Sequence, residues 1–178
     1  LFYTFPLKYI GLGEPAVLLV WGPLMAGGGY FVITGEWSTN VVWASVAYAL
    51  GPTAVLFGKH IDKLGADSGK GIRTLPVILG ERVSRHCVLG MLLAQFGVLA
   101  GLVWSGYFSP AVFVVLLALP SLRRVFQIYG RRRPKAPPAD MPAGVWPLWF
   151  VAAAFWYTRR FGALFLLGLV IDIALSRA

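Results

Sequence analysis

The sequence predicts an all-α protein, a polytopic bundle of transmembrane helices with about five to six helical segments. Its residues are 58% hydrophobic and only 13% charged, and that charged share is about half that of a typical soluble domain. Four separate apolar stretches also approach the ~20 residues that a helix needs to cross a bilayer. We therefore expect a lipid bilayer around the chain and treat residues 1–178 as a single transmembrane domain.

The net charge of +9 does not indicate a nucleic-acid-binding protein. Binding of that kind needs a basic face on a soluble fold, whereas the basic residues here lie between long apolar runs. The single cysteine, Cys87, excludes an internal disulfide and a cysteine-based metal site. We therefore expect no nucleic acid among the partners.

Four apolar segments are the candidate spanning helices. Their glycines would allow neighbouring helices to approach closely in lipid. In chain order they run roughly over Pro15–Ile33, Val41–Phe57, Cys87–Trp104 and Ala111–Tyr129.

The end of the chain allows two interpretations. Trp146–Tyr157 and Phe161–Leu175 are both apolar but short, and Arg159 and Arg160 lie between them. One straight helix through both would place two arginines in mid-span, at several kcal/mol each. We expect the first piece to be an interfacial or re-entrant helix, because its tryptophans favour the membrane interface, and the second to be a short final span. Two short crossings are the alternative.

The basic residues predict the orientation. If the final span begins after Arg160, 15 of the 16 lysines and arginines fall on one side of the membrane. Basic loops remain in the cytoplasm. We expect a multi-pass protein of the cell membrane whose loop 58–86, between the second and third spans, forms a cytoplasmic cap.

This loop contains the residues with the clearest chemical potential. Asp62 and Asp67 lie among basic residues and glycines, and Mg²⁺ commonly joins one or two carboxylates to substrate phosphates. Lys59, Lys70 and Arg73 would neutralise the remaining phosphate oxygens. The plainer alternative is that both aspartates pair with neighbouring lysines.

The spacing of the two aspartates restricts the first interpretation. On one continuous helix they would point about 140° apart, so they converge on one metal only if the helix ends between them. Gly65 offers such a break. His60, beside Asp62, is expected to be a structural or rim residue.

The run Asp62-Lys-Leu-Gly-Ala-Asp67, followed by Gly69-Lys70-Gly71-Ile72-Arg73-Thr74-Leu75-Pro76-Val77 and Leu79-Gly80, resembles the second aspartate-rich motif of the UbiA-type prenyltransferases. The opening from Tyr3 through Lys8 to Glu14 resembles the Tyr/Lys loop before that family's fifth span. The resemblance is nearest to the branch that prenylates 1,4-dihydroxy-2-naphthoate, and it covers nearly the whole chain.

The resemblance implies part of a nine-helix bundle that transfers a polyprenyl group from a polyprenyl diphosphate to an aromatic acceptor, in menaquinone-like quinone biosynthesis. It implies Mg²⁺ as the cofactor, with Asp62 and Asp67 as its catalytic ligands. Carried over in the same way, the contacts to the diphosphate are Lys8, Lys70 and Arg73, with Lys59 a weaker candidate and Tyr3 a cap residue near the substrate.

Two departures from the family pattern bear on these assignments. The aspartates are five positions apart instead of four, and Tyr3 to Lys8 is one residue longer than usual. No Asn-Asp-x-x-Asp motif occurs in the chain. We therefore expect the C-terminal part of a larger prenyltransferase, inactive alone because the first aspartate motif is absent. The alternatives are a non-catalytic membrane transporter or lipid-binding scaffold, and a family member that has lost catalysis.

Overall fold

The computed structural model describes residues 6–139, 141 and 144–176, which form helices and turns with no strand among them. The helices in chain order are η1 (Leu7–Tyr9), α1 (Gly13–Leu19), η2 (Val20–Gly27), α2 (Gly28–Thr34), α3 (Thr39–Asp62), α4 (Leu64–Gly69), α5 (Leu75–Trp104), η3 (Pro110–Ala118), α6 (Leu119–Tyr129) and α7 (Trp149–Ser176).

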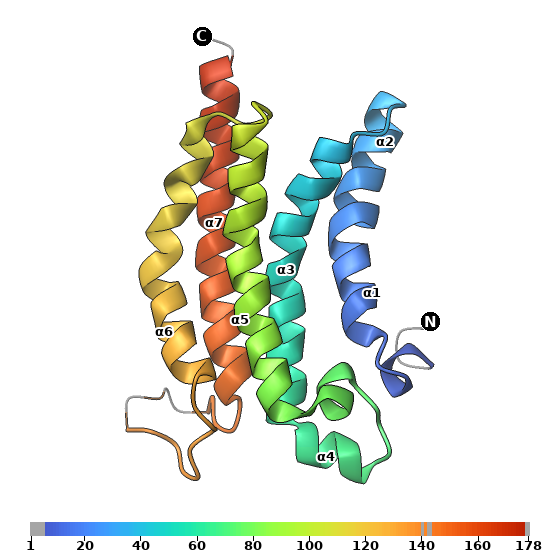
Figure 1. The fold of residues 1–178 in the computed structure, drawn as a ribbon, viewed down its shortest axis with the longest axis vertical. Coiled ribbons are helices and arrows are strands. Elements are labelled where there is room, and N and C mark those ends of the chain that lie inside the picture. The colour runs from blue at the N-terminus through green and yellow to red at the C-terminus, as the bar shows by residue number, and fades with distance from the viewer. Residues whose placement is uncertain (1–5, 140, 142–143, 177–178) are drawn as a thin grey trace.

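The predicted all-helical membrane bundle is confirmed. Four helical stretches of the described chain are long and apolar enough to cross a membrane: Gly13–Thr34, Thr39–Asp62, Leu75–Trp104 and Pro110–Tyr129. In Figure 1, α3, α5, η3–α6 and α7 run side by side, while the α1–η2–α2 rod stands at one edge beside α3. The helix α4 and the connector before α7 lie at the same end of the bundle.

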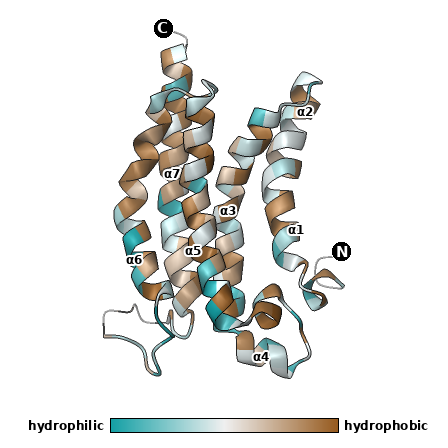
Figure 2. Ribbon diagram, viewed as in Figure 1, coloured by the Kyte–Doolittle hydropathy of each residue, from teal (hydrophilic) through white to brown (hydrophobic). Residues whose placement is uncertain are grey.

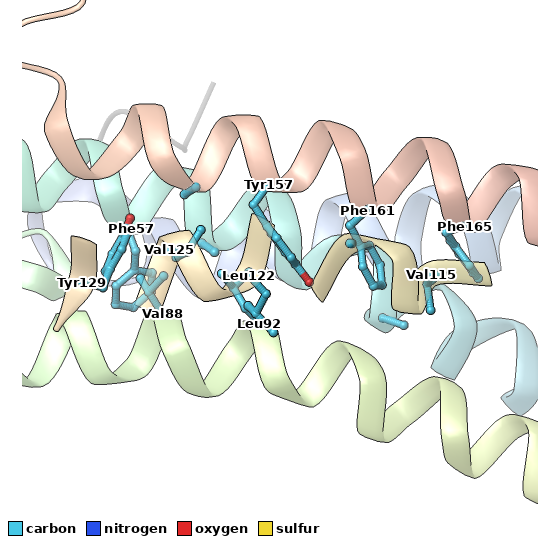
Figure 3. Packing of buried hydrophobic residues seen from close by; sticks show 14 of the residues in the cluster. Phe57, Val88, Leu92, Val115, Leu122, Val125, Tyr129, Tyr157, Phe161 and Phe165 are labelled. Atoms are coloured by element: carbon cyan, nitrogen blue, oxygen red, sulfur yellow. The ribbon is translucent and has the colours of Figure 1, made fainter. Parts of the chain in front are cut away.

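The core belongs to the four-helix bundle. Figure 3 shows Tyr157, Phe161 and Phe165 of α7 in one row that faces α5 and α6. The rings of Tyr157 and Phe161 stack with centroids 5.9 Å apart, as expected for side chains four positions apart on one helix face. Among the described residues, none from 13–34 belongs to this core. The first span packs mainly on α3, where a Cβ on Gly22 would lie 3.0 Å from that of Ala49.

The middle of the first span is a π-helix, Val20–Gly27. It contains Pro23, which has no N–H to donate to the preceding turn, and this loss favours a local change of helical register. The span ends at Gly35, whose φ of 74° is the left-handed conformation that closes many helices.

The expectation for the end of the chain is wrong. Residues Trp149–Ser176 form one continuous helix of 28 residues, without a break at Arg159 and Arg160. Neither the interfacial helix nor the two short crossings exists. Figure 1 shows α7 running the whole height of the bundle.

The physical reason is that α7 is longer than a bilayer is thick. From Arg160 to Ser176 it rises about 24 Å, whereas from Trp149 to Arg160 it rises about 16 Å. Thr158 packs against Gly51, near the middle of α3. The Arg159 side chain reaches back from this depth toward the start of α7, where its guanidinium lies over the rings of Phe155 and Trp156. Lys59 on α3 and Arg85 on α5 lie about 30 and 28 Å from the far ends of their helices, close to the hydrocarbon thickness of about 30 Å.

Basic residues at this depth mark one boundary of the apolar layer, and tryptophans mark the other. Figure 2 shows hydrophilic residues on α5 and α6 gathering toward the end that carries α4. At the opposite end, Trp37 and Trp104 are exposed, Trp104 by 94%. Exposed tryptophans of this kind are typical of a membrane interface.

Candidate functional site

The aspartate loop folds as a short helix between α3 and α5. The two aspartates can converge only if the helix ends between them, and it does end there, at Lys63 instead of Gly65. Asp67 lies in α4, and its main-chain oxygen accepts hydrogen bonds from the N–H groups of Lys70 and Ile72, at 3.1 and 3.0 Å. These bonds turn the chain back toward α5.

The side chain of Asp67 is buried but incompletely paired. The residue is 6% exposed, and its Oδ2 has no hydrogen-bond partner among the described residues. The hydroxyl of Thr74, seven residues later, is likewise buried without a partner. Buried polar atoms in native proteins nearly always have a partner, so two unpaired oxygens in one loop indicate a site for a ligand.

Gly80 shapes the far end of the loop. Its φ of 77° and ψ of 161° interrupt α5 between a first piece, 75–79, and the long span that follows. This region of backbone conformation is open essentially to glycine alone. The glycine of the Leu79-Gly80 pair therefore turns the first piece of α5 away from the axis of the span.

The N-terminal segment packs directly on the aspartate loop. Gly11 has a φ of +76°, and a Cβ there would lie 3.6 Å from the main-chain oxygen of Arg73 and 2.5 Å from Cδ1 of Ile78. Three residues later, Oε2 of Glu14 accepts a hydrogen bond from the N–H of Leu75 at 3.3 Å. Lys8, which is half-buried in η1, thus belongs to a loop in contact with the segment of Arg73.

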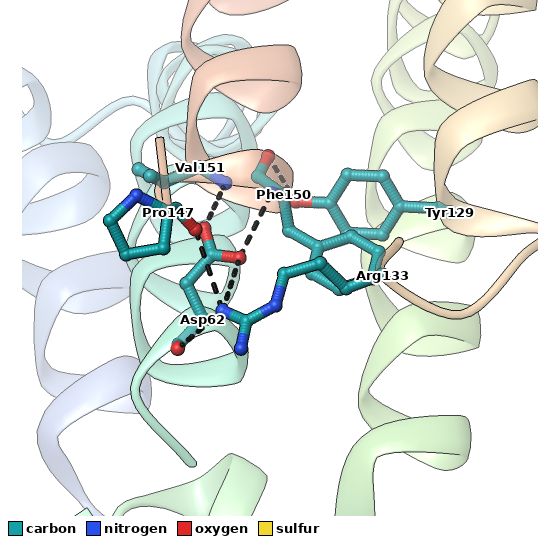
Figure 4. A network of polar contacts seen from close by, with 6 residues as sticks. All are labelled: Asp62, Tyr129, Arg133, Pro147, Phe150 and Val151. Carbon is teal, nitrogen blue, oxygen red and sulfur yellow. Dashed lines mark hydrogen bonds and ion pairs between the residues drawn. The ribbon is translucent and has the colours of Figure 1, made fainter. Parts of the chain in front are cut away.

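Asp62 has other partners (Figure 4). Its side chain is 1% exposed, and its two oxygens accept hydrogen bonds from the N–H groups of Phe150 and Val151, at 3.1 and 2.9 Å. These N–H groups belong to the first turn of α7, where main-chain donors lack partners within the helix and a carboxylate is favoured. Arg133 also donates to the main-chain oxygen of Asp62, at 3.0 Å.

This network depends on a close approach of three helices. The hydroxyl of Tyr129 donates to the main-chain oxygen of Phe150 at 2.8 Å. A Cβ on Gly58 would lie 2.6 Å from that hydroxyl and 2.9 Å from the backbone of Val151. Glycine at 58 therefore lets α3, α6 and α7 meet where Asp62 reaches the start of α7.

The remaining candidate residues are distributed around the loop. Lys70 and Arg73 are exposed, as is Lys59 on the last turns of α3. Tyr3 lies outside the described residues. Lys59 and Arg159 both line a cavity of about 600 Å³ between the first span, α3 and α7, whose other walls are mainly apolar and include Trp21, Pro52 and Leu166.

The fit of Mg²⁺ to this site rests on Asp67. Its unpaired oxygen suits a hard cation, which commonly takes one or two carboxylates and completes its shell with substrate phosphates and water. The carboxylate of Asp62 is already engaged by α7. Among the described residues, no three histidine, cysteine, aspartate or glutamate side chains gather as a metal site, so Asp67 fits as one ligand among several.

The family model for the UbiA prenyltransferase family matches residues 1–143, which is most of the chain and includes both contacting loops. The chain belongs to the UbiA prenyltransferase family. With its apolar helices, this membership makes it an integral membrane protein.

The chain is similar to family members whose names refer to naphthoate or naphthoquinone substrates. The 1,4-dihydroxy-2-naphthoate octaprenyltransferase of Haemophilus influenzae is 29% identical over 135 residues, which cover 72% of this chain and 42% of that protein. A 2-carboxy-1,4-naphthoquinone phytyltransferase of Synechocystis is 32% identical over 79 residues, 44% of this chain and 26% of that protein. The predicted family, with its likeness to the naphthoate branch, is confirmed.

The relatives are considerably longer than this chain. The UbiA prenyltransferase domain-containing protein 1 homolog of Drosophila melanogaster is 30% identical over 129 residues, which cover 71% of this chain but 34% of that protein. The chain thus spans less than half the length of these curated relatives. No solved structure matches it.

Sequence reasoning did not single out two residues beside this candidate site. Glu14 is buried against His60 with Oε1 2.6 Å from Nδ1, across 46 positions of sequence, so no local pattern indicates the pair. The sequence predicts Arg159 in a connection between helices, but it lies within α7 and lines the cavity beside Lys59. The available signal was a charge between two apolar pieces, because a charged residue within a span is a functional candidate.

Proposed function

We propose that this protein transfers a polyprenyl group from a polyprenyl diphosphate to an aromatic acceptor of the dihydroxynaphthoate type, in menaquinone-like quinone biosynthesis. Family membership supports the reaction class, and the names of the naphthoate prenyltransferase relatives support the acceptor. The single observation that carries the site assignment is the buried, unpaired Oδ2 of Asp67 in a loop rich in cations.

The diphosphate would lie over the contact between the N-terminal loop and the aspartate loop. Asp67 would hold Mg²⁺, which supplies positive charge to stabilise the diphosphate as it leaves. Lys70 and Lys8 would each pair with phosphate oxygens, and the planar guanidinium of Arg73 would bind two of them at once. Tyr3 is proposed as a cap residue near the substrate. The assignment of Asp62 as a second ligand stays a prediction, since it would have to exchange its α7 partners.

The polyprenyl chain would occupy the cavity between the first span, α3 and α7. Its apolar walls would exclude water from the allylic cation that forms when the C–O bond to the diphosphate breaks. Lys59, near the end of α3, and Arg159, which also lines the cavity, would attract the diphosphate toward it. The acceptor ring would then attack the cation and lose a proton from the attacked carbon.

The basic end is proposed to face the cytoplasm, with the loop 58–86 as a cap on that side of the cell membrane. The same distribution of lysine and arginine that predicts this orientation from sequence supports it here. We also propose that activity needs an additional aspartate motif from the remainder of a full-length protein, so that residues 1–178 alone are inactive.

A transporter remains the less supported alternative. Gln95 is the one polar residue that the sequence places deep in a span, and both polar atoms of its amide bond to other helices of the bundle. Its Nε2 donates to the main-chain oxygen of Ala47 at 2.8 Å, and its Oε1 accepts from the hydroxyl of Tyr157 at 3.1 Å. This network joins α3, α5 and α7, so the amide already has a structural role in packing these helices.

The test is prenyl transfer by the full-length protein in liposomes, with 1,4-dihydroxy-2-naphthoate as acceptor and Mg²⁺ varied. Asp67→Asn should lower the rate by about 10²–10³-fold, the scale for losing one electrostatic group in a transition state, and should raise the Mg²⁺ concentration needed for half-maximal rate. Arg73→Gln should raise the KM for the polyprenyl diphosphate.

Lys63→Gln is the matched control, because Lys63 is an exposed lysine of the same loop with no proposed ligand. Wild-type activity in both Asp67→Asn and Arg73→Gln would show that this loop does not bind the diphosphate. Transfer to no aromatic acceptor by a folded wild-type protein would contradict the proposed reaction itself.

A further inference from the structure

Glu14 and His60 form a buried polar pair where the start of α1, the end of α3 and the start of α5 meet, at the end of the bundle that carries α4 (Figure 1). The two residues are 1% and 2% exposed. Oε1 of Glu14 lies 2.6 Å from Nδ1 of His60, and Oε2 accepts a hydrogen bond from the N–H of Leu75 at 3.3 Å. We propose that Glu14 and His60 are positioning residues, which hold the loop of Lys8 against the loop of Arg73 so that both cations reach one diphosphate.

Glu14 takes the place of a local helix cap at the start of α5. Thr74 is the N-cap residue, and a threonine there normally accepts a hydrogen bond from the first turn, but its hydroxyl makes no such bond. Pro76, in the same turn, has no N–H to donate. The acceptor for the first N–H group of α5 instead comes from α1, 61 positions earlier. The start of α5, and with it Arg73 two residues before, is therefore held by α1 and not by its own local sequence.

A second contact joins the same two loops. Gly11 lies between Lys8 and Glu14, and a Cβ on it would lie 3.6 Å from the main-chain oxygen of Arg73. Its φ of +76° is a conformation that glycine adopts without strain. Two contacts, one through Gly11 and one through Glu14, fix the orientation of the loops as well as their separation. Lys8 is three residues before the first of these contacts.

The polar character of the pair favours positioning over simple stabilisation. Replacement of a buried ionic pair by apolar side chains often leaves stability unchanged or raises it, so packing alone does not require Glu14 and His60. Hydrogen bonds are directional, and a carboxylate that makes two of them restricts the geometry of both partners. His60 lies in the last turn of α3, which ends at Asp62. The same carboxylate thus positions both loops relative to the end of α3.

Binding of geranyl diphosphate with Mg²⁺ to the full-length protein in detergent micelles, measured by calorimetry, tests the proposal. Glu14→Leu/His60→Leu should weaken binding by about 10–100-fold, the range for residues that hold a binding group from behind. The KM for the aromatic acceptor should not change, because neither loop is proposed to bind the acceptor. Glu14→Gln should restore most of the affinity, since an amide can accept from Leu75 and donate to His60.

Glu14→Asp is a second variant that answers the same question if the double variant does not fold. It keeps the carboxylate but shortens the side chain by one methylene, so the carboxylate no longer reaches both partners. It should therefore also weaken the binding of geranyl diphosphate. Wild-type affinity in Glu14→Asp, or in a folded Glu14→Leu/His60→Leu, would overturn the proposal, as would an equal rise in the KM for the acceptor.

Gln95→Leu/Tyr157→Phe is the matched control. It removes another buried polar pair, 3.1 Å apart, that joins α5 and α7 away from both loops, so it should keep the affinity for geranyl diphosphate even if it lowers stability. An equal loss of affinity in this control would show that the Glu14 and His60 variants act only through stability.

The positioning role rests on the proposed function, and the two fail in different ways. No binding by folded wild-type protein, or wild-type affinity in Arg73→Gln, would contradict the proposed function and the positioning role with it. Weak binding by Arg73→Gln together with tight binding by Glu14→Leu/His60→Leu would contradict the positioning role alone.

Discussion

Nδ1 of His60 lies 2.6 Å from Oε1 of Glu14, and both side chains are buried. The other oxygen of the same carboxylate accepts the N–H of Leu75. One carboxylate therefore joins the start of α1, the last turn of α3 and the first turn of α5. Because Lys8 precedes α1 and Arg73 precedes α5, this contact fixes the relative position of two loops that we propose bind the diphosphate.

Removing either partner should destabilise the protein severely. Glu14→Ala and His60→Ala should each lower the free energy of unfolding by about 3–5 kcal/mol, the range for one partner lost from a buried pair. The measurement is unfolding in detergent micelles, followed by helicity. The double variant should lose much less than the sum, since neither group is then left alone. Strictly additive losses would show that the two side chains do not interact, and Glu36→Ala, at an exposed acid, is the control.

Substitution of Asp62 should mainly lower stability, whereas substitution of Asp67 should mainly lower prenyl-transfer activity. Asp62→Asn should lower the free energy of unfolding by about 1–2 kcal/mol, as for a lost helix cap, because the start of α7 loses its carboxylate acceptor. Asp67→Asn should leave stability nearly unchanged and abolish most prenyl transfer. The measurement is paired melting and activity data on each variant. Normal stability with lost activity in Asp62→Asn would identify Asp62 as a metal ligand, as the family pattern implies.

Gly80 should not tolerate a side chain. Gly80→Ala forces an alanine into a region that costs about 1–3 kcal/mol, so the melting temperature should fall and the loop 58–86 should become more accessible to protease. Gly90→Ala on the same helix is the control: a Cβ there meets nothing within 4 Å, and alanine in a helix interior should stabilise by about 0.5–1 kcal/mol. Equal effects of the two substitutions would mean that the interruption at Gly80 is absent in the membrane.

Because α7 is one continuous helix, we expect its C-terminal end on the opposite side of the membrane from the loop 58–86. In a Cys87→Ser background, Ser176→Cys and Glu36→Cys should react with a membrane-impermeant maleimide from one side of the bilayer, and Lys63→Cys from the other. Labelling of Ser176→Cys and Lys63→Cys from the same side would require a break in α7 near its arginine pair.

Much of the fold could be predicted because each spanning helix is indicated by one long, continuous apolar stretch of sequence. The first four spans needed only length and apolar content, and the aspartate loop needed only its polar composition. The prediction for the last helix was wrong because the cost of Arg159 and Arg160 within a helix was taken as a reason for a break there. In the structure α7 continues, and the guanidinium of Arg159 reaches back along it to lie over the rings of Phe155 and Trp156.

The candidate site could be predicted only in part, because its contacts join distant segments. The sequence indicates that Asp67 and Arg73 belong to one loop, since six positions separate them. It does not indicate that Gly11 touches the backbone at Arg73, or that Asp62 bonds to α7 88 positions away. Such pairings depend on how the helices pack. Gly58 permits the contact of Asp62 with α7 because a side chain at 58 would clash with Tyr129 and Val151.

The bond between Asp62 and the start of α7 also has a consequence for biosynthesis. A ribosome synthesises Asp62 long before Phe150, its partner 88 positions later. Until α7 has entered the bilayer, this carboxylate has no main-chain donors to bind, and the close passage at Gly58 stays open. Insertion of α7 is therefore the step that gives Asp62 its main-chain donors, and a nascent chain that stalls before it would keep an unpaired acid at the end of α3.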